Sequence, residues 1–93
     1  MDIPLEISNN EAQQRLEGRV RGALCRLDYR IEDGVMHLIH TQVPSFAEGR
    51  GIGGQLVKAA MDHAEAHGLR VHPVCSFVAT WIRRHPEYDR LRA

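Results

Sequence analysis

A glycine-dense segment, VPSFAEGRGIGG at residues 43–54, stands between an apolar stretch and a helix-forming stretch. At the start of a helix, about four backbone N–H groups lack intrahelical partners, and the helix dipole adds partial positive charge. Glycine lets such a backbone approach a bound anion closely, because no Cβ intervenes. We therefore expect Gly49, Gly51, Gly53 and Gly54 to form a cradle for a phosphate group.

Two familiar glycine motifs do not account for this segment. A Walker loop ends in Lys-Ser or Lys-Thr, and no such pair follows these glycines. The dinucleotide-binding fingerprint has the spacing Gly-x-Gly-x-x-Gly within a long, doubly wound chain, whereas this chain has 93 residues and a different glycine spacing. The structural alternative, in which the glycines only form a tight strand-to-helix turn, stays open at this point.

Six histidines raise the question of a metal site. His63 and His67 lie four residues apart on one face of the expected helix, and His72 could serve as a third ligand. The arrangement His-Glu-x-x-His is absent, and exposed helix histidines are commonly ordinary surface residues. We therefore expect no metal ion.

Charge, length and cysteine content limit the class of protein. Twelve Lys plus Arg balance twelve Asp plus Glu, so the chain lacks the basic field that drives nonspecific binding of nucleic acid. Cys25 and Cys75 form no Cys-x-x-Cys unit, and no apolar run has the length of a membrane span. We expect a single domain over residues 1–93, cytoplasmic and reduced, with neither nucleic acid nor a membrane as partner.

The elements that position the glycine segment follow from periodicity. Alternation of apolar and polar residues predicts strands over residues 3–7 and 23–31. Strands are also expected over residues 35–43, as the returning arm of a hairpin, and over residues 69–74, where Pro73 interrupts. Residues 14–20 are ambiguous, because residues 11–16 are helix formers and Gly18 breaks the stretch, and we favour a strand. Asn9-Asn10 is expected to form a turn, and Asp33-Gly34 predicts a tight hairpin. In the third strand, the period of two directs Cys25 into the core.

Two amphipathic helices are expected in the second half of the chain. Residues 51–67 carry apolar residues at helical spacing, and Gly68 is a typical terminator. Residues 77–84 form a second helix that ends before Pro86. Its residues expected to pack inward are Phe77, Trp81 and Ile82. The order of elements predicts an α+β domain with helices on at least one face of the sheet.

Three segments together resemble a known family. They are EGRGIG at residues 48–53, PVCSFV at residues 73–78 and IRRHPEY at residues 82–88. In this combination they resemble the small YjdJ-type branch of the GNAT N-acetyltransferase superfamily. The resemblance implies an α+β, GNAT-like (acyl-CoA N-acyltransferase) fold in minimal form, with a mixed, mostly antiparallel sheet and two main helices.

The resemblance also implies acetyl-CoA as cosubstrate. Its pyrophosphate would lie on the backbone amides of residues 49–54, and its pantetheine arm between splayed parallel strands at residues 38–43 and 69–74. The implied cofactor-binding residues are Thr41, Gln42, Val43, Gly49, Arg50, Gly51, Ile52, Gly53 and Gly54. Glu48 stands where the superfamily usually has Gln or Arg, so we expect it to turn away, or the affinity to suffer.

The thioester would lie near Cys75, which could act as nucleophile or give a proton to the departing CoA thiolate. Both roles depend on its pKa, which His40, His72, His85 or the start of the next helix would lower. The alternative for Cys75 is a buried, inert thiol. In the direct transfer usual in the superfamily, a backbone amide near residues 41–43 would polarise the carbonyl, and His40 is a candidate base.

The sequence thus predicts an acetyl-CoA-dependent N-acetyltransferase, a monomer or weak homodimer, that acts on an unidentified amine of a small molecule or protein. Two alternatives stay open: a non-catalytic CoA-binding regulatory module, and a protein–protein adaptor in which the glycine segment is only a turn. Binding of CoA distinguishes the adaptor from the other two, and turnover on an amine distinguishes the enzyme from the module.

Overall fold

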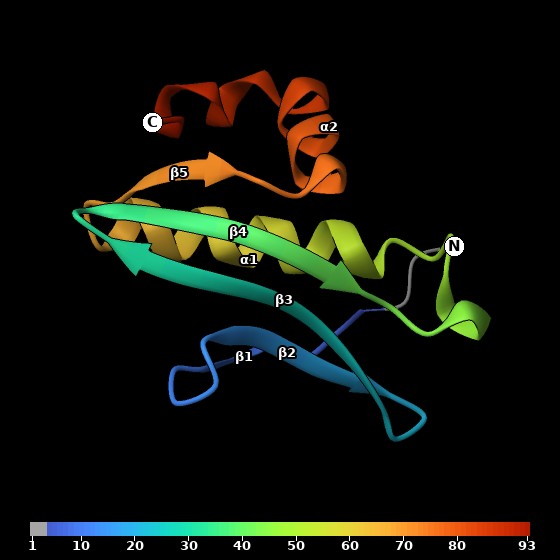
Figure 1. Cartoon of the computed structure of the whole chain (residues 1–93). Helices are drawn as coiled ribbons and strands as arrows, with labels where there is room; N and C mark the ends of the chain where they lie inside the picture. Colours follow the sequence, from blue (N-terminus) through green and yellow to red (C-terminus); the bar gives the residue numbers. More distant parts are fainter. Residues whose placement is uncertain (1–3) are drawn as a thin grey trace.

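The structure, a computed structural model, describes residues 4–93 and contains a five-stranded sheet with two α-helices (Figure 1). The strands are β1 (Ser8–Asn10), β2 (Arg15–Val20), β3 (Ala23–Glu32), β4 (Val35–Gln42) and β5 (Arg70–Pro73). The helices are α1 (Ile52–Ala66) and α2 (Ser76–Arg84), and the 3-10 helices are η1 (Ser45–Ala47) and η2 (Pro86–Leu91). The predicted fold class is confirmed, while the two 3-10 helices were not predicted.

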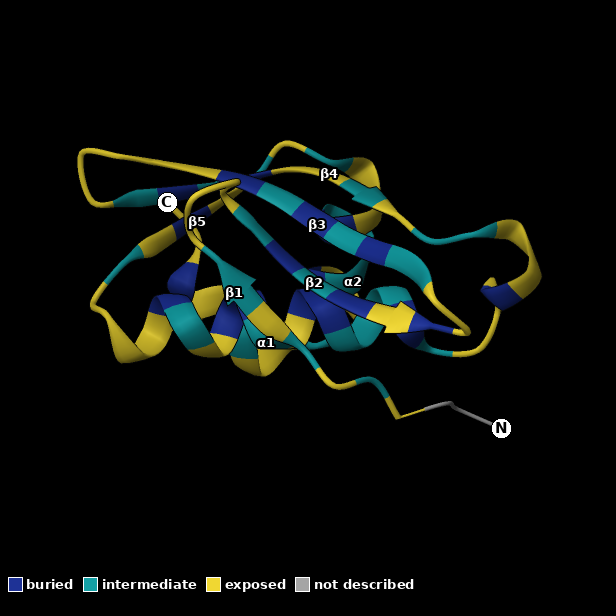
Figure 2. Ribbon diagram, turned by 90° about the horizontal axis from the view of Figure 1, so that it is seen from below, coloured by how far each residue is buried: buried dark blue, intermediate teal, exposed yellow. Residues whose placement is uncertain are grey.

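The strands lie in chain order across the sheet, and only β5 runs parallel to its neighbour, β4. The chain passes from β4 to β5 through α1, which lies against one face of the sheet (Figures 1 and 2). Within residues 4–93, no helix covers the opposite face (Figure 1). Because β4 and β5 are parallel, the loop after β4, the start of α1 and the end of β5 meet at one end of the sheet.

One apolar core joins α1 to the sheet. The helix residues that are almost completely buried recur at helical spacing: Ile52, Leu56, Val57, Ala60, Met61 and Ala64. They pack against buried strand residues that include Leu27, Met36, Leu38 and Val71 (Figure 2). None of the helices in the described part of the chain is long and apolar enough to cross a membrane.

The edge of the sheet begins later than predicted. Residue 3 lies outside the described residues, and residues 4–7 form no strand. The N–H of Leu5 instead donates a hydrogen bond to Oε1 of Gln55 at 2.8 Å, which ties this segment to α1. The edge strand is β1, directly after the predicted one.

The predicted turn at Asn9-Asn10 is wrong, because both residues belong to β1. Oδ1 of Asn9 accepts a hydrogen bond from the hydroxyl of Tyr29 at 2.7 Å. Oδ1 of Asn10 accepts the N–H of Gln13 at 3.1 Å, so its side chain stabilises the turn that follows at residues 11–14. The asparagines thus mark the end of the strand that precedes the turn.

A β-bulge in β4, which the sequence did not predict, changes the direction of its side chains. The pairing with β3 skips Ile39, so β4 has one extra residue at this point. Leu38 is fully buried, Ile39 and His40 are both exposed, and Thr41 is half-buried. The bulge therefore places Thr41 on the face that Leu38 occupies and leaves His40 on the opposite face.

Close packing explains the glycine at position 18 in β2. A Cβ at Gly18 would lie 2.7 Å from the carbonyl oxygen of Glu6 and 2.8 Å from Cγ of Leu5. We expect Gly18→Ala to lower the free energy of unfolding by about 1–3 kcal/mol, as overpacking does. Gly68→Ala, at φ +67° with no atom within 4 Å of the new Cβ, should cost about 1 kcal/mol from backbone strain alone. Urea denaturation measures both, and a smaller loss at Gly18 than at Gly68 would contradict the packing argument.

Candidate active site at the end of β4

A pocket of about 390 Å³ lies at the end of β4, beside the start of α1. Its lining residues are Thr41, Val43, Ala47, Glu48, Gly49, Gly51, Ile52, Gly53, Gly54 and Phe77. Of the residues predicted to bind a cofactor, only Gln42 and Arg50 do not line it. The structure therefore brings most of the predicted binding residues together around one cavity.

The glycine loop leads into α1 through two left-handed residues. Gly49 and Gly51 have φ values of +77° and +76°, in the left-handed region that favours glycine. Gly51 is the N-cap of α1, no side chain caps this helix start, and its first turn contains no acidic residue. The first N–H groups of α1 and the positive end of its dipole are thus without a side-chain partner at the pocket wall.

The parallel strands β4 and β5 diverge as predicted. Their pairing ends at Leu38 and Pro73, where proline has no N–H to continue the ladder. The next N–H, of Val74, turns back to the carbonyl oxygen of His72 at 3.1 Å. The N–H of Cys75 reaches the carbonyl oxygen of Leu38 at 3.0 Å, and beyond this point β4 continues without a parallel partner.

Cys75 lies at the N-cap of α2, half-buried, with Sγ 3.7 Å from Oγ1 of Thr41. Burial raises the pKa of this thiol, but hydrogen bonds outweigh it, and the net pKa is below the ordinary value of 9.0. The donors are the backbone N–H groups of Val78, Phe77 and Thr41 and the Thr41 hydroxyl. By contrast, Cys25 is fully buried, and burial raises its pKa. Only Cys75 therefore has an environment that stabilises a thiolate.

Histidines do not supply this effect. Nδ1 of His72 lies 2.9 Å from Nδ1 of His37 on the neighbouring strand. His85 stacks on Trp81, and its Nδ1 lies 2.7 Å from the Trp81 carbonyl oxygen. The groups that lower the Cys75 pKa are backbone amides and a hydroxyl, so the predicted influence of the histidines is not found.

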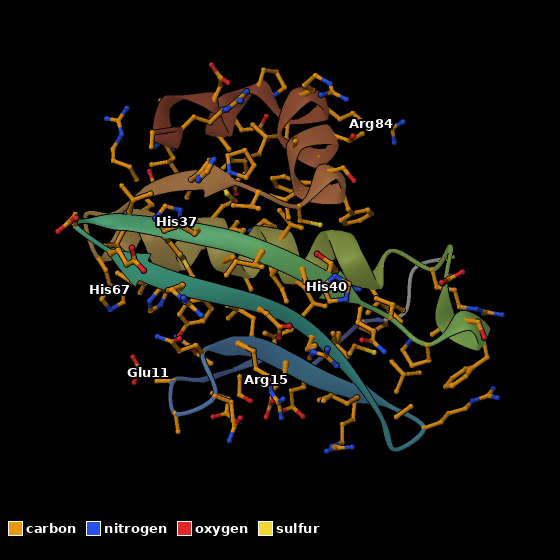
Figure 3. The ribbon with its side chains drawn as sticks, viewed as in Figure 1. Glu11, Arg15, His37, His40, His67 and Arg84 are labelled. Atoms are coloured by element: carbon orange, nitrogen blue, oxygen red, sulfur yellow. The ribbon has the colours of Figure 1, made fainter. Side chains whose placement is uncertain are left out.

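His40, the candidate base, lies next to Thr41 in β4 but on the opposite face of the sheet (Figure 3). It pairs across the strands with Asp28, and it is exposed. The physical reason is the bulge, which gives Thr41 the inward position that plain alternation would give His40. The role of His40 as a base stays a prediction.

One pocket residue differs from the prediction, and a second is placed without deciding it. Phe77 was expected to pack inward, yet it is 46% exposed and its ring lies over Gly53, where an added Cβ would come within 2.8 Å of Cζ. Ile82 is buried as predicted, and Val78 provides the rest of the buried face of α2. Glu48 was expected to turn away or the affinity for the ligand to suffer; the residue lines the pocket, and the choice between the two stays a prediction.

The pair His63 and His67 forms a ring stack rather than a chelating arrangement, with centroids 4.1 Å apart. His67 Nδ1 lies 2.9 Å from the carbonyl oxygen of His63. Within the described part of the chain, no group of three or more His, Cys, Asp or Glu side chains could hold a metal ion.

The two thiols should react with iodoacetamide at different pH. Alkylation requires the thiolate, and the lowered pKa of Cys75 means that its thiolate persists at lower pH than in an ordinary thiol. We expect alkylation of Cys75 to inflect below pH 9.0 and Cys25 to stay unlabelled in the folded protein. Thr41→Val, which removes one donor, should move the inflection upward. Peptide mass spectrometry measures both sites, and an inflection of Cys75 at or above that of a denatured control would contradict the expectation.

Comparison with known proteins gives consistent matches. The model of a family described as GCN5-related N-acetyl-transferase matches residues 15–91. Protein NATD1 of Danio rerio is 33% identical over 76 residues, which cover 80% of this chain and 68% of that protein. Protein NATD1 of Bos taurus is 28% identical over 87 residues, which cover 89% of this chain and 76% of that protein. A GCN5-like protein of Staphylococcus aureus, with a solution structure determined by NMR, matches with a TM-score of 0.75 at 25% identity, over 96% of this chain and 88% of that one.

Proposed function

Since this chain belongs to the family of GCN5-related N-acetyltransferases, we propose that it binds acetyl-CoA in the pocket at the end of β4 and transfers the acetyl group to an amine. The observation that carries the proposal is the arrangement of two features around one cavity. An uncapped helix start with left-handed glycines forms one wall, and Thr41, in contact with the Cys75 thiol, forms another. An adaptor would need neither feature.

The residues at the pocket fit a CoA thioester. The N–H groups at the start of α1 suit the diphosphate, since they are donors without side-chain partners at the positive end of a dipole. The part of β4 beyond Leu38, which has no parallel partner, suits the amides of the pantetheine arm. When bound, acetyl-CoA supplies an activated acyl group, so the protein has only to position it and to stabilise charge.

The lowered pKa of Cys75 favours a covalent route. The Cys75 thiolate attacks the carbonyl carbon, a sulfur–carbon bond forms, and the bond to the CoA sulfur breaks to release the CoA thiolate. The N–H of Thr41, which points toward Sγ, lies where it can donate to the carbonyl oxygen as negative charge develops. An acceptor amine then attacks acetyl-Cys75, loses a proton to solvent, and restores the Cys75 thiolate. A thiol of low pKa is better suited to act as the nucleophile than to donate a proton to the CoA thiolate.

Titration of isotope-labelled protein with CoA and acetyl-CoA, followed by backbone amide NMR, tests the proposal without a known acceptor. We expect shifts confined to residues 41–43, 49–54 and 71–75. Shifts without turnover on any amine would favour a regulatory CoA-binding module. If millimolar ligand causes no shift, the transferase function is ruled out and the adaptor is left.

Glu48 allows a separate prediction on affinity. Glu48 lines the pocket that we assign to a polyanion, so its negative charge and that of the ligand should repel each other. We expect Glu48→Gln to increase the affinity for CoA about two- to fivefold at low salt and less at high salt. Glu32→Gln, at the exposed end of β3, is the matched control and should have no effect. Equal affinities for Glu48→Gln and the unaltered protein would place Glu48 away from the ligand.

A further inference from the structure

Beside the pocket, the first turn of α1 faces an aromatic pair on the last turns of α2. Trp81 and His85 stack with ring centroids 3.8 Å apart and an interplanar angle of 14°. The hydrogen-bond distance of 2.7 Å between His85 Nδ1 and the Trp81 carbonyl oxygen holds this arrangement. Nε1 of Trp81 lies 3.2 Å from the position of a Cβ at Gly54, so the pair is next to the glycine loop.

Two hollows of similar size adjoin this aromatic pair. The first, of about 390 Å³, is lined by Ser76, Phe77, Thr80, Trp81, Arg84 and His85, and shares Phe77 with the pocket at the end of β4. The second, of about 380 Å³, also has Trp81 and His85 in its wall and shares Gly51 and Gly54 with that pocket. A ligand seated on the glycine loop could extend into either one.

Charge distinguishes the two hollows. In the first, the Arg84 guanidinium projects away from α2, and within residues 4–93 it forms no hydrogen bond or ion pair (Figure 3). Among the described residues, no carboxylate lines this hollow, and Ser76 and Thr80 add hydroxyl groups. In the second, the cation is Lys58, whose Nζ already lies 2.8 Å from Oδ2 of Asp62, and Glu87 lies in the wall. Only the first hollow offers an uncompensated positive charge.

We infer that this first hollow binds the 3′-phosphoadenosine end of CoA, with adenine against the Trp81–His85 pair and the 3′-phosphate on Arg84. The inference rests on the proposed function, because it extends the ligand from the glycine loop across Phe77. A purine stacks well on aromatic side chains, and a guanidinium binds phosphate through parallel N–H donors. The hollow would then select free CoA thioesters over acyl-phosphopantetheine groups that lack the nucleotide, such as those attached to a carrier protein.

Trp81 is the only tryptophan of the chain, so its fluorescence reports on this hollow directly. The probes are CoA, 3′-dephospho-CoA and 4′-phosphopantetheine, which lose the 3′-phosphate and then the whole nucleotide. We expect CoA and 3′-dephospho-CoA to change the Trp81 emission and 4′-phosphopantetheine to leave it unchanged. We also expect CoA to bind about tenfold more tightly than 3′-dephospho-CoA, in the range of one charge-assisted contact.

Two matched variants assign the phosphate contact. Arg84→Gln should reduce the preference for CoA over 3′-dephospho-CoA to less than twofold, whereas Lys58→Gln, in the other hollow, should leave it unchanged. If Lys58→Gln reduced the preference for CoA and Arg84→Gln left it unchanged, the inference would be overturned and the nucleotide would lie in the second hollow.

The same titrations separate this inference from the proposed function. If CoA shifts the amides of residues 49–54 but leaves Trp81 emission unchanged and binds no better than 3′-dephospho-CoA, the inference alone fails. If CoA shifts no amide at all, the proposed function fails with it.

Discussion

Replacing Cys75 by alanine is expected to abolish acetylation of the protein by acetyl-CoA and to lower amine acetylation by at least about a hundredfold, with CoA affinity changed less than about threefold. The reason is the environment of Sγ, where the start of α2 and Thr41 direct their donors at one sulfur atom. The variant removes the nucleophile and leaves the glycine loop intact. Because Sγ also accepts from the N–H groups of Phe77 and Val78 at the start of α2, its loss should lower the free energy of unfolding by about 1 kcal/mol, which leaves the protein folded.

Mass spectrometry of the intact protein after incubation with acetyl-CoA measures this effect, and the matched variant is Cys25→Ala. Cys25 is fully buried in β3, so its substitution should leave an acetylated protein of somewhat lower stability. An amide NMR spectrum of each variant verifies that it is folded. Full turnover by Cys75→Ala would exclude the covalent route and leave direct transfer, with Thr41 polarising the carbonyl.

Substitution of Gly51 by valine is expected to weaken CoA binding by at least about tenfold. The residue has φ +76°, a conformation that costs an L-residue roughly 1–2 kcal/mol, and a β-branched one more. The loop can relieve this strain only by changing its backbone, which would move the N–H groups of Ile52 and Gly53 away from the ligand. NMR titration gives the affinity.

Gly34→Val is the control for this prediction. Gly34 has φ +77° in the hairpin between β3 and β4, at the end of β4 opposite to the pocket, and no atom lies within 4 Å of a Cβ there. The two variants should lose similar stability, but only Gly51→Val should lose affinity. Equal affinities of Gly51→Val and Gly34→Val for CoA would show that the loop conformation does not determine binding.

The features that could be predicted from the sequence depend on local patterns. The period of two in residues 23–31 and the helical spacing of residues 51–67 each follow from one element that packs against one core. The glycine loop was predictable for the same reason, since Gly49 and Gly51 adopt a local conformation that few other residues tolerate. The position of Cys75 directly before α2 likewise follows from neighbouring residues.

The features that were missed depend on how separate elements meet. No local pattern marks Ile39 as an extra residue, because a bulge exists only relative to the partner strand. The exposure of Phe77 depends on how α2 is rotated against the start of α1. For the same reason, the sequence suggested histidines as neighbours of Cys75, where the fold places the amides of Thr41, Phe77 and Val78.

The bulge in β4 has a consequence for how this chain can vary during evolution. Before the bulge, the strand supplies Leu38 to the core, and after it the strand supplies Thr41 to the pocket. The side chain of Ile39 is exposed, so mutation can exchange it at little cost, and deletion of the residue would leave Leu38, His40 and Thr41 in regular alternation with Thr41 still facing inward. This position can therefore change in the length of the chain as well as in the identity of its amino acid while Thr41 stays at the pocket.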